Sequence, residues 1–211
     1  MDSLQLKIDF GETEDVKKIA ESEKELHLRK AELARSSLNS DKVLANENIF
    51  VFTFDLEKAL AFPKLSCSVA YYKTNMYVYN LGFHSFNDNT GYMFMWDETQ
   101  ESRGSQEIAS CLVNFLKKHA STHSHIIMYS DCCTSQNRNI KISLSLLKLA
   151  QDPEMTANYI DHKFLTSGHS YLPNDADFGV IESKAKRKNL FMAQVIGLIL
   201  SQMQKEQSPF K

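Results

Sequence analysis

Two aspartates stand where a carboxylate can do chemistry. Asp131 directly follows the apolar run at 125–130 and precedes a cluster of small polar residues at 132–139, and Asp55 closes a second apolar run, Ile49–Phe54. In α/β proteins a buried strand fixes the backbone while the loop beyond it opens to solvent, which is how a functional carboxylate is often presented. Aspartate is also disfavoured inside strands. Both positions therefore indicate a functional site.

A third acid is expected near the start of a helix at 175–188, where Asp175, Asp177 and Glu182 are the alternatives. Asp175 and Glu182 lie seven residues apart and so share one helix face. Three carboxylates within a few ångströms repel one another unless cations or protons intervene. Oxygen ligands favour Mg²⁺ or Mn²⁺ over Zn²⁺, and two such ions about 4 Å apart can promote phosphodiester cleavage. The predicted ligands of two ions are Asp55, Asp131 and a third acid from the last helix, Asp175 or Asp177.

Other interpretations of these positions stay open. Asp55 could equally cap a short helix at 56–60. His169, in the loop before the last helix, could shuttle protons or only order that loop. Cys132 and Cys133 are adjacent, so their side chains diverge, and the spacing typical of zinc sites is missing. No base for a cysteine nucleophile can be identified from spacing.

Basic residues offer local contacts rather than a global field, because the 211-residue chain carries a net charge of −2. DNA binding would then depend on small patches or divalent cations. Arg138 could touch substrate phosphates. Lys186, Arg187 and Lys188 form either a solvated helix end, a DNA contact or a nuclear address.

The elements that must position these residues follow in the order strand, strand, strand, helix, strand, helix, strand, helix. Hydrophobic periodicity and turn signals predict strands at 49–54, 76–86, 92–96, 126–130 and 159–164, and helices at 105–119, 140–150 and 175–188. Ser105 is expected to cap the first of these helices, and Ile140, Leu144 and Leu147 to form the buried stripe of the second. Residues 61–72 are expected to be an irregular connection with a short helical piece. By analogy, this order predicts an α/β fold with a ribonuclease H-like mixed sheet, whose first and fourth strands are central neighbours.

A charged helix is predicted from residue 12 to about residue 38, ending at 39–41. Its thin apolar seam is interrupted by Glu23 and Lys30, which favours a surface helix or a short coiled-coil arm able to associate with a second copy. The seam residues are Val16, Ile19, Leu26 and Leu33. The expected organisation is a helical arm at 1–47, the main domain at 48–189 and a C-terminal helix or tail at 190–211.

Composition favours an intracellular protein. The four cysteines form no C-x-x-C pair and no signal peptide is recognisable, which indicates a reducing compartment. The apolar segment Leu190–Leu200 is too short to span a bilayer. With a DNA substrate, the expected location is the nucleus.

Short motifs spread from about His27 to Glu182 are specific in combination. They are Phe54–Leu60 with Pro63–Leu65, Tyr71–Tyr72, Val78–His84, Trp96–Glu98 with Arg103–Gly104, Ser130–Cys132 with Gln136–Asn139, and Gly168–Ser170 followed by Pro173, Asp175, Phe178, Ile181 and Glu182. In these motifs the chain resembles a family of transposon-derived proteins of animal genomes, whose shared domain is of unknown function.

This resemblance implies a ribonuclease H-like integrase or transposase core, with Asp55, Asp131 and Asp175 as the matching acids and His169 and Glu182 at accessory positions. Members are typically longer, with an N-terminal cysteine-containing region, and after Lys188 this sequence leaves their pattern. The leading expectation is a metal-dependent domain that cleaves or transfers DNA strands. The alternative is an inactive transposase remnant that acts as a protein- or nucleic-acid-binding module.

Overall fold

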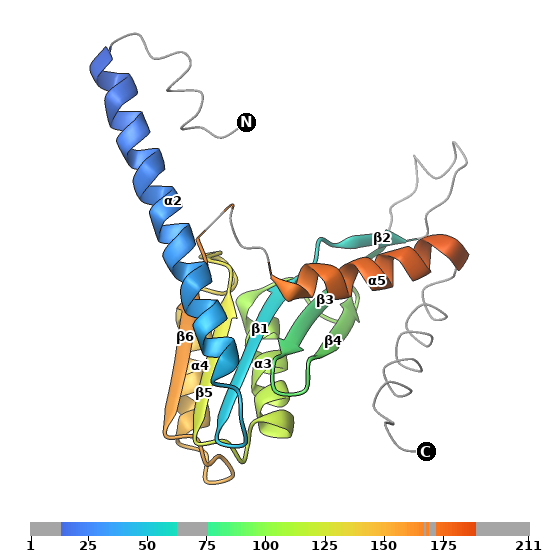
Figure 1. Cartoon of the computed structure of the whole chain (residues 1–211). Helices are drawn as coiled ribbons and strands as arrows, with labels where there is room; N and C mark the ends of the chain where they lie inside the picture. The colour runs from blue at the N-terminus through green and yellow to red at the C-terminus, as the bar shows by residue number, and fades with distance from the viewer. Residues whose placement is uncertain (1–13, 63–75, 167, 169–171, 189–211) are drawn as a thin grey trace, which may run out of the picture.

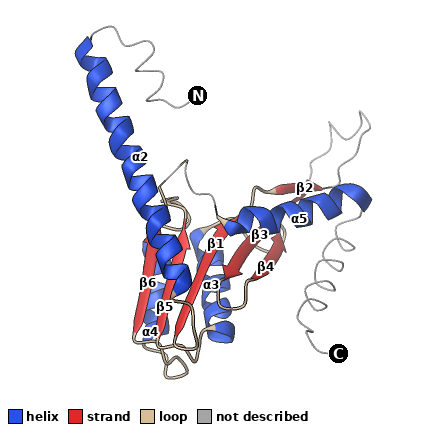
Figure 2. Cartoon of the chain, viewed as in Figure 1, coloured by secondary structure: helices blue, strands red, loops and turns tan. Residues whose placement is uncertain are grey.

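The computed structural model describes residues 14–62, 76–166, 168 and 172–188, and there the protein is an α/β sandwich built on one mixed sheet (Figures 1 and 2). The elements in chain order are α2 (Glu14–Val43), β1 (Ile49–Leu56), β2 (Leu60–Phe62), β3 (Met76–Ser85), β4 (Thr90–Asp97), α3 (Ser105–His119), β5 (His125–Ser130), α4 (Ile140–Ala150), β6 (Tyr159–Phe164) and α5 (Pro173–Lys188). None of these helices is both long and apolar enough to cross a membrane.

Six described strands form the sheet. β1, β5 and β6 run parallel to one another, whereas β3 is antiparallel to β1, β2 and β4. β4 pairs with β3 from Val78 to Ser85, so β1 and the short β2 share the other edge of β3. The order across the sheet is therefore β4-β3-β1-β5-β6, with β1 and β5 as central neighbours.

The central strand β1 is largely buried on both faces, because helices cover both (Figure 1). Phe50, Phe52 and Phe54 point into the larger core beneath α3 and α4. Successive strand residues point to opposite faces, and Val51 accordingly packs in the smaller core that includes Leu38 of α2. α5 crosses the same face as α2. The odd-numbered side chains of β1 therefore face α2 and α5.

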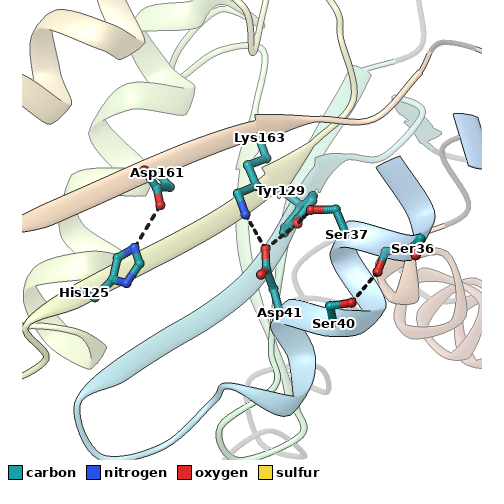
Figure 3. A network of polar contacts seen from close by, with 8 residues as sticks. All are labelled: Ser36, Ser37, Ser40, Asp41, His125, Tyr129, Asp161 and Lys163. Carbon is teal, nitrogen blue, oxygen red and sulfur yellow. Dashed lines mark hydrogen bonds and ion pairs between the residues drawn. The ribbon is translucent and has the colours of Figure 1, made fainter. Parts of the chain in front are cut away.

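The C-terminal end of α2 is fixed to the sheet by polar contacts (Figure 3). The Asp41 carboxylate accepts hydrogen bonds from the Tyr129 hydroxyl at 2.5 Å and from Lys163 Nζ at 2.5 Å. Ser37 Oγ lies 2.9 Å from the Tyr129 hydroxyl oxygen. The predicted end of the arm at residues 39–41 is thus wrong: the helix continues to Val43, since Leu38 and Asp41 are buried there.

Two local predictions around β1 are corrected by the structure. Asp55 lies inside β1, paired with Gly82 of β3, and residues 56–60 form no helix, so the helix-cap interpretation of Asp55 is wrong. Residues 61 and 62 belong to strand β2 (Leu60–Phe62) rather than to an irregular connection, because β2 pairs with β3 along the same edge as β1. Residues 63–72 of that connection lie outside the described residues.

The predicted helix at 140–150 is confirmed, but its buried face is not the predicted one. Ile142, Leu146 and Leu149 are buried against α3 and the sheet. The expected stripe of Ile140, Leu144 and Leu147 is exposed instead. Both sets have helical spacing, so periodicity alone could not choose between them.

The cap of α3 also differs from the prediction. Gly104 is the N-cap residue and Ser105 is the first helical residue, with no side-chain cap hydrogen bond. The proposed helix or tail at 190–211 lies outside the described residues.

Candidate metal and active site

Asp55 and Asp131 lie at the same edge of the sheet because β1 and β5 are parallel. The pairing between β1 and β5 ends at Thr53 and Tyr129. Each aspartate follows its paired residue by two positions, so both side chains continue the face that carries α2 and α5. The parallel register therefore brings these two acids together from positions 76 residues apart in the chain.

Asn174, at the start of α5, ties that helix to the two strands nearest Asp55. Thr53 Oγ1 donates to Asn174 Oδ1 at 2.6 Å, and Asn174 Nδ2 donates to the Gly82 carbonyl at 2.9 Å. Thr53 and Asn174 are fully buried. A buried polar group that loses its partner is costly, so this bridge fixes where α5 begins and hence where Asp175 lies.

A glycine allows α5 to approach the sheet closely. A Cβ atom built on Gly82 would lie 2.6 Å from Phe178 Cε1, which real side chains do not tolerate. Phe178 and Ile181 of α5 are both buried. A larger residue at position 82 would therefore displace the Phe178 ring, through which α5 packs on β3.

The Asp55 carboxyl shows that the three aspartates interact. Burial, followed by the negative charges of Asp131 and then Asp175, raises the pKa of Asp55 to about 7, against an ordinary value of 3.8. The hydrogen bond from the Leu56 amide, at 2.9 Å, and the positive charge of Arg103 act in the opposite direction. The pKa of Asp55 therefore lies near neutrality, and a nearby cation would favour its charged form.

Asp131 is oriented by the loop that follows it. Its Oδ1 atom accepts a short hydrogen bond from Asn137 Nδ2 and a longer one, at 3.4 Å, from the Cys133 amide. Asn137 is buried. Asn139 caps α4 by accepting a hydrogen bond from the Lys141 amide at 3.0 Å. The Ser135–Asn139 segment thus positions Asp131 and starts the next helix.

A cleft of about 300 Å³ opens beside Asp55. Asp175 and Glu182 line it together from one face of α5. Lys58 and Gly179 also contribute to its walls.

Asp177 is separated from this cleft. Its carboxylate lies 2.8 Å from His84 Nδ1 and packs against Gly91 in the β3–β4 hairpin. Among the three alternatives for the third acid, Asp175 and Glu182 therefore lie beside Asp55, and Asp177 does not.

The donor set suits a hard cation only after side chains rotate. The acids offer oxygen ligands alone, which matches Mg²⁺ or Mn²⁺ chemistry. Within the described residues, however, no three His, Cys, Asp or Glu side chains already stand as a metal-binding group. Asp131 is engaged by Asn137, and Asp175 Oδ2 accepts from the Leu172 amide at 3.3 Å. Binding a cation would exchange these hydrogen bonds for metal ligation.

His162, on β6 beside the end of β5, is not suited to act as a base. Burial lowers the pKa of His162 to about 4. Its ring packs against Phe54 and Phe164, and its Nε2 lies 2.9 Å from Ser130 Oγ. His162 therefore supports the end of β5 as a neutral residue.

Several predicted positions lie beyond what the structure describes. His169 is outside the described residues, and so are the side chains of Lys186, Arg187 and Lys188, although the backbone of α5 continues to Lys188. Arg138 is exposed, with its guanidinium 3.8 Å from Cys132 Sγ. The Cys132 and Cys133 thiols are free.

Sequence patterns did not reveal the residues that position the acids. Asn174 and Thr53 were missed because their roles depend on contacts between residues 121 positions apart. Arg103 was missed because only the fold brings it near Asp55. No local pattern marked Asn174, whose side chain bonds Thr53 and Gly82 rather than the backbone of its own helix.

Comparisons of the chain with protein-family models, with curated proteins and with solved structures find no match. The geometry of the site therefore carries the functional argument.

Proposed function

We propose that this protein is a transposon-derived, ribonuclease H-like domain that uses two Mg²⁺ or Mn²⁺ ions to cleave or transfer phosphodiester strands of DNA. One observation carries the proposal: acids from β1, from the end of β5 and from the start of α5 converge at one sheet edge, where burial and then the charges of Asp131 and Asp175 raise the pKa of Asp55. A fold gains no stability from crowding like charges. Binding a cation is a function that explains the arrangement.

The strand order supports the fold assignment by analogy. β4-β3-β1-β5-β6, with β3 antiparallel and β1, β5 and β6 parallel, is the order expected for a ribonuclease H-like sheet. In that architecture the acids lie at the ends of the two central parallel strands. Fold similarity alone does not establish an activity, so the proposal depends on the acids.

Each acid has a proposed role. Asp55 and Asp131 would flank the ions, and Asp175 would complete the ligand set, with Glu182 as the substitute across the same cleft. Bound ions of this kind activate a water molecule and stabilise the leaving oxygen. Lys58 and Arg103 supply positive charge beside the cleft for substrate phosphates. Arg138, Lys186, Arg187 and Lys188 are proposed as outer DNA contacts, His169 as a proton carrier, and the nucleus as the location.

Cleavage of labelled DNA by the full chain in Mg²⁺ or Mn²⁺ tests this function. We expect nicking that is abolished in Asp131→Asn and in Asp55→Asn. Asp177→Asn is the matched control, because Asp177 lies on the same helix as Asp175 but pairs with His84. Equal cleavage by wild type and Asp131→Asn would refute the mechanism.

A second function is favoured by a specific observation. Asp131 and Asp175 are held by hydrogen bonds from Asn137 and from the Leu172 amide, and no three acids already stand as a metal-binding group in the described residues. An inactive remnant that binds protein or nucleic acid would keep this arrangement. Titration with Mn²⁺, read by paramagnetic broadening of the Asp55 carboxyl signal, separates the two functions. Selective broadening supports the enzyme, and its absence at millimolar Mn²⁺ supports the remnant.

A further inference from the structure

Helix α4 is apolar on two sides, although the fold buries only one of them. The buried side packs against α3 and the sheet. The other side is a stripe of large side chains at helical spacing that face solvent, and we call it the α4 stripe. It consists of Ile140 (68% exposed), Leu144 (57%) and Leu147 (58%). A helix that is apolar on most of its circumference is normally covered on most of it.

The neighbouring helix α3 shows that the fold itself does not require this stripe. α3 packs on the same core beside α4 and directs its apolar residues inward. None of its large apolar side chains is exposed, although α3 has 15 residues against 11 in α4. Three neighbouring apolar side chains on the solvent side of α4 therefore indicate a docking surface.

Two lysines run along one flank of the α4 stripe. Lys141 and Lys148 are seven residues apart and so share one side of the helix, and each directly follows a residue of the stripe. Among the described residues, neither forms an ion pair with a carboxylate. Asp152, just beyond the end of the helix, pairs instead with Lys117 of α3 at 2.6 Å. The α4 stripe is therefore bordered by two positive charges that have no ion-pair partner within the described fold.

A groove of about 760 Å³ lies between α3 and α4. Lys141, Ser145 and Lys148 line it from α4, and Asn114 and Lys117 line it from α3. Ser145 lies on the side of the lysines that is turned away from the stripe. Across the surface of α4 the order is thus an apolar stripe, a row of lysines and a concave polar groove.

We propose that the α4 stripe and its lysine row bind an acidic amphipathic helix of another protein. Such a helix places apolar side chains on the stripe and carboxylates against Lys141 and Lys148. At 1.5 Å per residue the two lysines are about 10 Å apart along α4, so a helix aligned with α4 needs carboxylates about seven residues apart. α4 lies on the opposite face of the sheet from α5 (Figure 1), so this surface is independent of the proposed metal chemistry.

Other occupants match only part of this surface. Nucleic-acid phosphates would pair with the lysines but would leave the apolar stripe in water. A lipid surface would cover the stripe and meet the lysines, but it would leave the groove between α3 and α4 unfilled. The same surface of a second copy would bring lysines rather than carboxylates to this one. An acidic helix matches the stripe and the charges, and its acidic side chains can extend into the groove toward Asn114.

Fluorescence anisotropy of labelled helical peptides, titrated with the full chain at low salt, tests the proposal. One peptide carries leucines at heptad core positions and glutamates seven residues apart along their flank. The matched peptide carries lysines in place of those glutamates. We expect the acidic peptide to bind and the basic one to bind at least about tenfold more weakly. Equal binding of the two peptides, or no binding of the acidic one, would overturn the proposal.

A substitution in the stripe locates the contact. Leu144→Asp should weaken binding of the acidic peptide by at least about tenfold, because it places a charge at the centre of the apolar contact. Val180→Asp is the matched control: Val180 is similarly exposed, 52% against 57% for Leu144, but lies on α5. Circular dichroism checks that both variants fold. Equal losses in the two variants would contradict binding at the α4 stripe.

Charge reversal separates the acidic helix from the other occupants. The double variant Lys141→Glu, Lys148→Glu should lose the acidic peptide and bind the basic one. Lys118→Glu, on α3 outside the groove, should change neither affinity. Labelled double-stranded DNA and vesicles containing phosphatidylserine are tested against the same variants. DNA or vesicle binding that Leu144→Asp or the double variant abolishes, without binding of the acidic peptide, would assign the surface to that ligand and overturn the proposal.

Discussion

Two aspartates on the same face of the sheet have opposite surroundings. Asp41, on α2, is compensated within the fold by Lys163 and by the Tyr129 hydroxyl, each at 2.5 Å (Figure 3). Asp55, on β1, has Asp131 and Asp175 as neighbours, and burial together with their charges raises its pKa to about 7. Asp41 is thus a structural acid with a cationic partner, whereas Asp55 is crowded by other acids.

The difference shows how this fold separates stability from chemistry. The charge of Asp41 holds an element in place, so its removal should harm folding. The charge of Asp55 opposes folding at neutral pH. Its removal should therefore stabilise the fold and impair only the proposed cation binding and cleavage. Four measurements can break or sharpen this contrast.

The largest expected effect is on Asp55. Its pKa is raised in the folded state, so the folded protein binds its proton more tightly than the unfolded chain does. The resulting stabilisation is present below about pH 4 and is lost as pH rises through 7. At pH 8, Asp55→Asn should therefore be more stable than wild type by on the order of 4 kcal/mol. Urea denaturation at pH 8 and pH 4 measures the difference, which should vanish at the lower pH.

Asp161→Asn is the control for that measurement. Asp161 pairs with His125 at 2.9 Å on the exposed surface, so its replacement should change stability by less than about 1 kcal/mol. If Asp55→Asn is no more stable than wild type at pH 8, the acids do not repel as described.

Asp41→Ala should have the opposite sign. It removes the shared acceptor of Lys163 and the Tyr129 hydroxyl, and only Ser37 Oγ remains beside that hydroxyl, so the cost should be about 2–3 kcal/mol. Thermal and urea denaturation report this loss. Arg29→Ala removes an exposed pair with Glu25 on the same helix and should cost less than about 0.5 kcal/mol. Similar losses in both variants would mean that α2 is not held by Asp41.

Asn174→Ala should cost about 2 kcal/mol, because it removes the acceptor of the buried Thr53 Oγ1 and a donor to the Gly82 carbonyl. It should also lower the pKa of Asp55, since Asp175 is no longer held beside it. Carbon-13 NMR of the Asp55 carboxyl during a pH titration measures that change. An Asp55 pKa unchanged from wild type would show that Asn174 does not position Asp175.

The smallest expected effect is that of the cation. At a Mg²⁺ concentration ten times its Kd, wild type at pH 7.5 should gain about 1.4 kcal/mol. Asp55→Asn should gain much less, whereas Asp41→Ala should gain as much as wild type, because its lesion is remote from the acids. Denaturation with and without Mg²⁺ provides the comparison. A gain retained in Asp55→Asn would place the cation elsewhere.

The regular elements were largely predictable because their signals are local. The apolar run Ile49–Phe54 predicted β1, and helical periodicity with its terminal signals predicted the helix at 140–150. Which face of that helix is buried was not predictable, since Ile140, Leu144 and Leu147 share the spacing of the residues that are buried. The continuation of α2 through Asp41 was missed because Lys163 lies 122 residues away.

The sequence by itself determined the α/β element order and the placement of Asp55 and Asp131 at the ends of apolar runs, because strand pattern and chain breaks are properties of neighbouring residues. Only the tertiary structure decided which acids meet. Parallel pairing of β1 with β5 brings Asp131 to Asp55, and the Asn174 bridge brings Asp175. Tertiary contacts also pair Asp177 with His84 and Asp41 with Lys163. The charge environment of an acid depends on residues distant in sequence, and folding alone brings them together.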